Sequence, residues 1–331
     1  MLGHAGASAR IVSALNRFSR TPLGTFPSPV RRARSANGEY FWIKDDGACS
    51  KIYGGNKVRK LEYLLATEKQ RGHRALVVHG DVESHTVQAC GLLGRQAGLE
   101  IHAVVFPHNG QSFDGTELAN LHRAGVRIHR RDSMLTAILW AHWIGWREHA
   151  AVVPLGASTP CATLGHVRAA LELLEQVRQG QLPEPRRIYI PFATGGSVAG
   201  LLIGLAMAGA KTRVAAVQTV ESVIANRRRL ESLVNRTLKL LGFGQQEFGL
   251  CLERLEQIDR GQLGKGYRDI TVPTQKAVDL AVKHGLRLEP AFSGKAFATL
   301  LEALPEFPND ELLFWNTHDQ SGDSASLGDS R

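Results

Sequence analysis

Apolar residues along the chain fall into short runs, separated by longer stretches in which they recur every three or four positions. Short apolar runs are typical of buried parallel strands, and the longer period is typical of helices packed on a sheet. The runs predict strands at 41–44, 75–79, 101–106, 126–129, 151–154, 188–191, 214–217 and 312–315. The periodic stretches predict helices at 60–71, 87–97, 116–124, 135–148, 163–179, 198–208 and 274–284.

This alternation of strands and helices predicts an α/β fold with parallel sheets. The length of 331 residues suggests about two domains, at roughly 150 residues each. A hydrophobic content of 43 % is enough for a sizeable core. The last segment, 321–331, is rich in Ser, Gly and Asp and is predicted to be a disordered tail.

Charge is spread unevenly along the chain. The net charge is +9, but residues 1–38 hold six arginines and no acidic residue. The remainder is nearly balanced, so nucleic-acid binding by the folded part is not indicated. We interpret the dense run Arg227-Arg228-Arg229 as a solvated helix face. The N-terminal composition has two interpretations, a mitochondrial presequence or a short amphipathic helix at 11–18 packed on the body.

The four cysteines are far apart and form no C-x-x-C pair. Neither a zinc site nor a disulfide framework is suggested, and we expect no metal; a reducing, cytoplasmic compartment is the default expectation. No apolar run approaches the ~20 residues needed to span a membrane.

Lys57 has an unusual setting. In segment 53–65 two glycines and Asn56 predict a turn, and a helical pattern follows directly. The first turn of a helix is electrostatically unfavourable for a cation, because the amino end of the helix dipole is positive. That placement favours the neutral amine, which can attack a carbonyl group. The alternative is an ordinary surface lysine.

A glycine loop forms the second candidate site. Residues 188–200 pass from an apolar strand into Thr194, Gly195, Gly196 and Ser197, and then into a helix of small residues. Such a loop can point several backbone N–H groups at one anion. The pattern is neither a Walker A loop nor G-x-G-x-x-G. It predicts a phosphate site, with a tight strand-to-helix turn as the alternative; together with a reactive lysine it indicates pyridoxal phosphate.

With these features, the chain resembles the D-cysteine desulfhydrase and 1-aminocyclopropane-1-carboxylate deaminase family of pyridoxal-phosphate enzymes. The similarity extends over nearly the whole chain and includes Gly-Gly-Asn-Lys followed by Arg-Lys-Leu-Glu. The matching blocks, in order, are 22–30, 42–46, 54–65, 153–158, 193–200, 266–267 and 288–296. The resemblance implies fold type II, the tryptophan synthase β-subunit fold, with two open twisted parallel-sheet α/β domains.

The resemblance also implies a role for each matching residue. Lys57 would form the Schiff base with pyridoxal 5'-phosphate, with Asn56 beside it. Ser84 would contact substrate or cofactor, and Tyr267 would lie over the site. The cofactor-binding positions would be Lys57, Asn56, His85, Thr194, Gly195, Gly196, Ser197 and Ser293. Ser293 would face the pyridine nitrogen; a neutral hydroxyl there suits β-elimination or β-replacement better than transamination.

Several positions depart from the family pattern. Glu83-Ser84-His85-Thr86 stands where Gln-Ser-Asn-His is usual. His85 therefore replaces an asparagine expected near the phenolic oxygen of the cofactor, although an imidazole can donate to that oxygen too.

Two further departures bear on the substrate. Phe292 replaces the tyrosine of the deaminases, which weakens the cyclopropane-deaminase interpretation. Asp81 and Glu83 would disfavour a substrate carboxylate unless they point away. Asn316-Thr317 stands where relatives often have His-Thr.

We therefore predict a lyase that performs α,β-elimination and deamination on a small, D-cysteine-like amino acid, giving a keto acid and ammonia. Lys57 would act as general base, and Ser84 would help to orient the substrate. Two alternatives stay open. One is another fold-type-II activity (cyclopropane-carboxylate deaminase, racemase or β-replacement), and the other is a cofactor binder with weakened catalysis.

The resemblance implies a large cofactor-binding domain formed by 1–74 and 166–320, with a small domain at 75–165. A homodimer is usual in the family. The expected partner at the site is a small amino acid, with no nucleic acid and no membrane.

Overall fold

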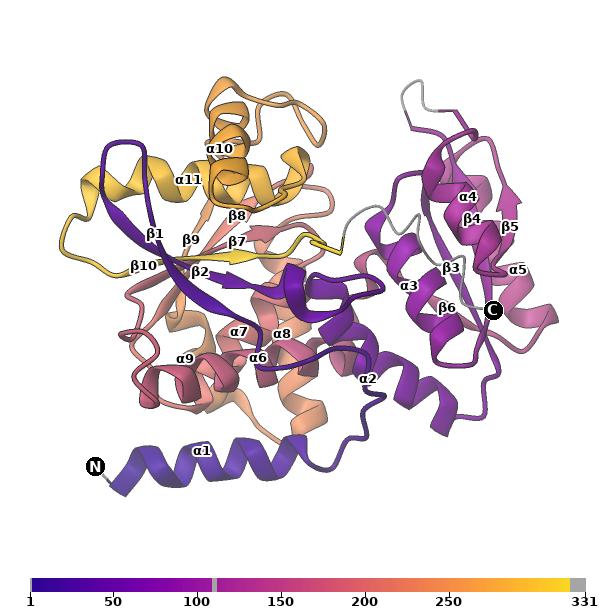
Figure 1. Ribbon diagram of the computed structural model, residues 1–331. Coiled ribbons are helices and arrows are strands. Elements are labelled where there is room, and N and C mark those ends of the chain that lie inside the picture. Colours follow the sequence, from indigo (N-terminus) through magenta and orange to yellow (C-terminus); the bar gives the residue numbers. More distant parts are fainter. Residues whose placement is uncertain (1, 109–111, 322–331) are drawn as a thin grey trace, which may run out of the picture.

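The computed structural model describes residues 2–108 and 112–321, and its elements form two sheets with helices packed around them (Figure 1). The tail predicted at 321–331 lies outside the described residues, apart from Ser321. The predicted α/β fold with parallel sheets is confirmed.

The larger sheet has six strands, and all but one neighbouring pair run parallel. In spatial order they are β1 (Val30–Arg34), β2 (Tyr40–Asp45), β10 (Leu312–Asn316), β7 (Arg187–Phe192), β8 (Arg213–Gln218) and β9 (Leu255–Asp259). The exception is β1, which pairs antiparallel with β2 at one edge.

Helices cover both faces of this sheet (Figure 1). Alternate residues of each buried strand point to opposite faces, so the strands contribute to two separate hydrophobic cores. One core includes α1 (Leu2–Leu15), α6 (Pro160–Arg178), α7 (Gly196–Met207), α8 (Arg227–Leu241) and α9 (Gln245–Glu253). The other includes α10 (Val272–Lys283) and α11 (Lys295–Ala303).

The smaller sheet has four parallel strands in the order β5 (Arg127–Arg130), β4 (Glu100–Phe106), β3 (Ala75–Asp81) and β6 (Ala151–Val153). Its central strands β3 and β4 are buried on both faces. One face packs on α2 (Asn56–Gln70), α3 (His85–Gln96) and α4 (Thr116–Arg123). The other face packs on α5 (Met134–Arg147).

The predicted domain limits at 75 and 165 stay predictions. The elements of the four-stranded sheet lie within 75–153, whereas residue 165 falls inside α6. Helix α6 packs against α7 of the larger unit and against α2, which also contacts α3. Helix α2 therefore lies between the two sheets.

The N-terminal helix is longer than the amphipathic helix considered at 11–18. Its residues Ile11, Ala14 and Leu15 are buried in the core beside α7. Beyond its end, Arg17 donates from Nη2 to the Leu241 carbonyl at 2.6 Å. Residues 11–17 are thus packed on the body of the protein.

All four cysteines are free thiols. Among the described residues, no helix is long and apolar enough to cross a membrane, and no cluster of three or more metal-ligating side chains occurs.

Candidate active site

One cleft brings together all ten residues predicted to form the site, and it encloses about 1060 Å³, including space open to solvent. It lies where strands of both sheets end: β3 leads to Ser84, β7 to Thr194 and β10 to Thr317. The carboxyl ends of parallel strands are the usual place for ligands in open α/β sheets. The predicted residues in the cleft are Asn56, Lys57, Ser84, His85, Thr194, Gly195, Gly196, Ser197, Tyr267 and Ser293.

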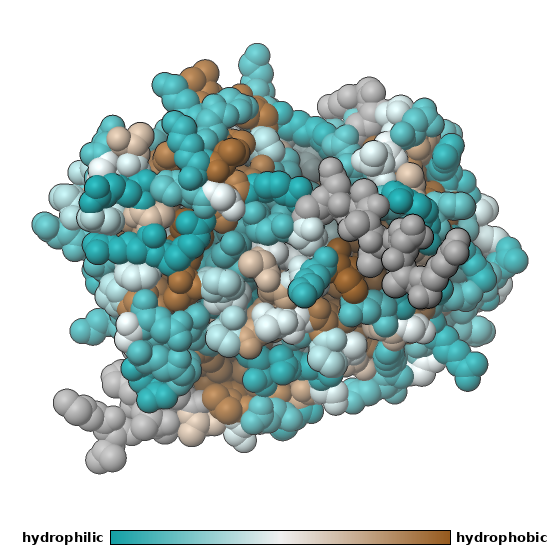
Figure 2. Space-filling view, viewed as in Figure 1, coloured by the Kyte–Doolittle hydropathy of each residue, from teal (hydrophilic) through white to brown (hydrophobic). Residues whose placement is uncertain are grey.

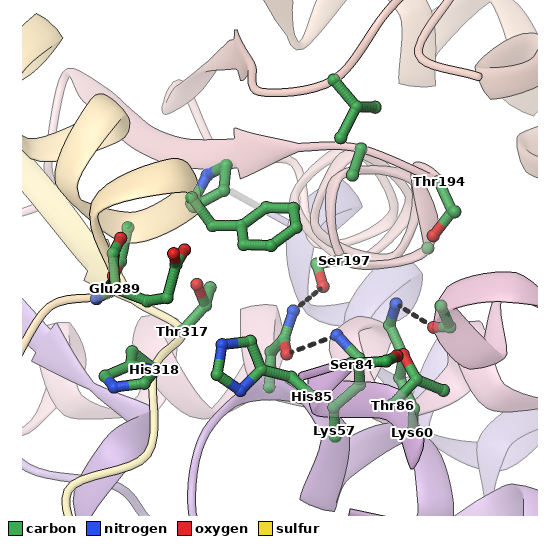
Figure 3. Close-up of a pocket in the computed structure, with 18 of the residues that line it drawn as sticks. Lys57, Lys60, Ser84, His85, Thr86, Thr194, Ser197, Glu289, Thr317 and His318 are labelled. Carbon is green, nitrogen blue, oxygen red and sulfur yellow. Dashed lines mark hydrogen bonds between the residues drawn. The ribbon is translucent and has the colours of Figure 1, made fainter. Parts of the chain in front are cut away.

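Lys57 lies in the first turn of α2, as the sequence predicted. The turn before it requires glycine, since Gly55 has φ 85° and a Cβ there would come within 2.4 Å of the Thr317 carbonyl oxygen. Lys57 Nζ donates to Asn56 Oδ1 at 3.1 Å, and Asn56 Nδ2 donates to Ser197 Oγ at 3.0 Å (Figure 3).

The lysine is therefore linked through Asn56 to the glycine loop. Burial lowers the pKa of Lys57 from 10.5 to about 8. Loss of solvation, rather than the helix dipole invoked from the sequence, is the main cause that the structure gives for a neutral amine.

The glycine loop has the form of an anion cradle. Gly195 adopts φ 85° and caps α7, so the first N–H groups of that helix face the cleft without helical partners. At Gly196 a Cβ would lie 2.7 Å from Ser158 Oγ and 2.9 Å from Lys60 Nζ, so only glycine leaves this space open.

Lys60 completes the cradle, and the sequence analysis missed it. Lys60 Nζ donates to the Gly156 carbonyl at 3.0 Å and to Ser158 Oγ at 3.2 Å, and Ser158 Oγ lies 2.7 Å from Thr194 Oγ1. Burial, together with the nearby charge of Lys57, lowers the pKa of Lys60 well below its usual value. A phosphate group would supply the negative charge that this buried amine lacks. Lys60 follows Lys57 by three residues, so both side chains lie on one face of α2. This spacing was the sequence signal from which Lys60 could have been predicted.

The start of α3 forms another wall of the cleft. Ser84 is the N-cap of α3 and makes no side-chain capping bond, so its hydroxyl is free for a ligand. His85 Nδ1 lies 2.8 Å from the Tyr53 hydroxyl, and burial lowers the pKa of His85 to about 3. His318, another residue that the sequence analysis missed, lies beside His85, with ring centroids 5.1 Å apart and an interplanar angle of 73° (Figure 3).

Ser293 lies in the π-helical turn Pro290–Gly294 and is fully buried. Its hydroxyl accepts from the Glu289 N–H at 2.9 Å and donates to the Glu289 carbonyl at 3.3 Å. The predicted contact with the pyridine nitrogen stays a prediction. Glu289 also lines the cleft, and its Oε2 is buried with no partner among the described residues. Burial raises the pKa of this carboxyl group, and a bound molecule with a hydrogen-bond donor would satisfy it.

Tyr267 lines the cleft, and Arg268 beside it lines an adjoining pocket. The ring of Tyr267 is 5.1 Å from that of Phe292. Arg268 Nη1 donates to Glu83 Oε2 at 2.7 Å, and Nη2 lies 3.9 Å from Asp81 Oδ1. The acidic pair that the sequence analysis considered unfavourable for a substrate carboxylate is therefore compensated by Arg268.

Comparison with known proteins agrees with this geometry. Residues 19–317 match the family described as pyridoxal-phosphate dependent enzymes. The chain is 28 % identical over 314 residues to nocardicin C-9' epimerase of Nocardia uniformis, covering 92 % of this chain and 93 % of the relative. It is 26 % identical over 314 residues to D-cysteine desulfhydrase of Klebsiella pneumoniae, covering 88 % and 90 %. A solved structure described as an ACC deaminase homologue superposes with a TM-score of 0.79, at 24 % identity and 95 % coverage of both chains.

The fold and the cleft define a fold-type-II enzyme. The chain belongs to the family of pyridoxal-phosphate-dependent enzymes, which confirms the cofactor and the family resemblance predicted from sequence. The cleft fits this cofactor, because a buried amine of lowered pKa lies beside a glycine cradle that contains a second buried amine.

Proposed function

We propose that the protein is a lyase that performs α,β-elimination and deamination on a small, D-cysteine-like amino acid, yielding a keto acid and ammonia. The observation that carries this proposal is the amine of Lys57, whose lowered pKa suits it both to hold the cofactor covalently and to act as a base. The likeness to a D-cysteine desulfhydrase supports the choice of substrate.

Different residues of the cleft would bind the cofactor and the substrate. The loop 194–197 and Lys60 would hold the phosphate of the cofactor, and Lys57 would be its covalent anchor. When bound, pyridoxal phosphate supplies a sink for the electrons of the substrate α-carbon. Ser84 and the free N–H groups at the start of α3 would orient the substrate carboxylate, since a helix amino terminus favours an anion.

Proton transfer and exclusion of water would involve the remaining residues. The freed amine of Lys57 would remove the α-proton of the substrate. The rings of Tyr267 and Phe292 would cover the cleft and limit the entry of water. Phe292 offers no hydroxyl for nucleophilic attack, so opening of a cyclopropane ring is less well supported than β-elimination.

A racemase is the second candidate, favoured by the likeness to an epimerase at 28 % identity. Removal of the α-proton by Lys57 is common to both reactions. Racemisation needs a donor that returns the proton on the other face, and the Ser84 hydroxyl would be that donor. Incorporation of deuterium at the α-carbon, without loss of the β-substituent, would favour this alternative.

Absorption spectroscopy tests the main proposal. A band near ~420 nm in the purified protein, absent in Lys57→Ala, would identify the cofactor anchor. D-cysteine, L-serine and aminocyclopropane carboxylate are then titrated, and sulfide, ammonia and keto acid are assayed. Release of sulfide from D-cysteine is expected. A band that none of these amino acids perturbs would instead favour a binder with weakened catalysis.

We further propose that the protein is a cytoplasmic homodimer, on the basis of the resemblance and the absence of paired cysteines. Light scattering coupled to gel filtration tests the oligomeric state. Cell fractionation tests the compartment, with mitochondria as the alternative location.

A further inference from the structure

Tyr267 lies in segment 260–271, between β9 and α10, where no helix or strand fixes the backbone. Instead, charged side chains form hydrogen bonds with both the N–H and the carbonyl group of Tyr267. Glu221 Oε1 accepts from the Tyr267 N–H at 3.0 Å. On the other side, Lys295 Nζ donates to the Tyr267 carbonyl at 3.3 Å, the Gly266 carbonyl at 3.0 Å and the Leu263 carbonyl at 3.1 Å.

Lys295 is an unusual residue for its position. It is 0 % exposed and is the first residue of α11, directly after the π-helical turn Pro290–Gly294. It forms no salt bridge among the described residues. Burial lowers the pKa of Lys295, and the carboxylates of Asp269, Glu289 and Glu221 oppose this by favouring the charged form. Burying an ammonium costs several kcal/mol unless its donors are satisfied. Here all three donors go to carbonyl oxygens of one segment.

We propose that Lys295 is a positioning residue, a built-in cation that draws three carbonyls of segment 263–267 together and, with Glu221, fixes Tyr267 over the cleft. An apolar side chain of similar length would fill the same space without the cost of a buried charge. The charge therefore serves to arrange the segment rather than to fill the core. The relevance of this arrangement to turnover rests on the proposed function, whereas the arrangement itself does not.

The same segment also reaches the opposite wall of the cleft. Arg268, next to Tyr267, pairs with Glu83 in the loop that follows β3 of the smaller sheet. Lys295 and Glu221 hold the segment to the larger unit, and Arg268 links it to the loop of the smaller unit. Loss of the Lys295 charge should therefore loosen Tyr267 and Arg268 together.

Hydrogen–deuterium exchange of the cofactor-free protein tests the proposal without any need for turnover. In Lys295→Met, the peptide covering 260–271 should exchange at least about tenfold faster, because local protection reports local opening. Lys44→Met is the matched control. Lys44 is also 0 % exposed, but it donates to Ser28, Glu172 and Gln176 in another part of the larger unit. Unchanged protection of 260–271 in Lys295→Met, or equal loss in both variants, would overturn the proposal.

Chemical rescue identifies the ammonium as the active group. Lys295→Ala leaves three carbonyl oxygens facing the space of the lost side chain. Ammonium and ethylammonium chloride should restore protection of 260–271, whereas tetramethylammonium chloride, which has no N–H donor, should not. Equal effects of all three salts, or restoration by none, would show that the charge does not organise this segment.

Kinetics then connect the arrangement to the site. We expect Lys295→Met to lower kcat/KM by up to about 100-fold, the loss that a misplacement of about 1 Å can cause. In a Tyr267→Ala background, which removes the ring itself, the further loss should be much smaller, because coupled residues are not additive. Full multiplication of the two losses would refute action through Tyr267. If the exchange and rescue results hold but no substrate is turned over, the proposed function fails and the role of Lys295 stands.

Discussion

The pKa of Lys57 can be tested directly in the cofactor-free protein. At pH 7 a lysine of pKa about 8 has roughly one amine in ten in the neutral form, against about three in ten thousand for a pKa of 10.5. Burial should thus raise the reactive fraction about 300-fold. The matched perturbation is Asn56→Asp, which places a carboxylate at the oxygen that lies 3.1 Å from Lys57 Nζ. An opposite charge this close should raise the pKa of Lys57 by about 1–3 units.

The assay mixes cofactor-free protein with limiting pyridoxal phosphate and follows the covalent bond to Lys57 at ~420 nm between pH 6 and 10. The rate should rise with pH and level off near 8 in the wild type, and level off later in Asn56→Asp. A wild-type rate that still rises tenfold per pH unit at pH 9 would refute the lowered pKa. The unfolding free energy should rise with pH between about 8 and 10.5. The cost of the buried Lys57 ammonium is fully present below pH about 8 and disappears as the pH rises to 10.5.

Three further predictions follow from the packing and charges of the site. Arg59 is buried and makes bidentate contacts of 2.8–2.9 Å to the carboxylates of Asp46 and Glu172. Arg59→Met removes these contacts, so the unfolding free energy should fall by about 3–5 kcal/mol in urea titrations; an unchanged midpoint would contradict this stabilising role. Gly196→Ala should weaken cofactor binding at least about tenfold in fluorescence titrations, because a Cβ would fill the cradle, whereas Gly249→Ala, with nothing within 4 Å, should bind normally. Burial sets the pKa of His85 to about 3 and that of His318 to about 4, so neither should titrate between pH 5 and 7; a step in kcat/KM in that range that disappears in His85→Asn would show otherwise.

The surface of the molecule, viewed from one side in Figure 2, is largely hydrophilic. Strands and helices with a clear apolar pattern were predicted well, because burial imposes that pattern. The edge strands β1 and β9 were missed, since Val30–Arg34 and Leu255–Asp259 are mostly polar and only half-buried. Helix α8 was recognised only as a basic face at Arg227–229, although Leu230 and Leu233 pack in the core.

The site was predictable where residues adjacent in sequence form a recognisable pattern, as at Lys57 and in the glycine loop. It was not predictable where single residues meet through the fold. Glu289 and Lys295 lie in the matching block 288–296, but nothing in that block distinguishes them, and His318 has no local motif. The importance of these three residues follows from burial and from contacts that the fold creates. Arg268 belongs to the same class, because its pairing with Glu83 depends on how the two sheets face each other.

Helix α2 carries both lysines of the candidate cofactor site, whereas the candidate substrate contacts lie on other segments. Lys57 and Lys60 lie one turn apart on a single rigid element, held near its start by Arg59, so the spacing between the covalent anchor and the phosphate site is set by helix geometry. The candidate substrate contacts, by contrast, come from the start of α3, from segment 260–271 and from the residues that follow β10. Mutations in these loops can change which amino acid is accepted without moving the cofactor. The scaffold is thus suited to diversification in evolution, and a newly acquired specificity would leave α2 unaltered.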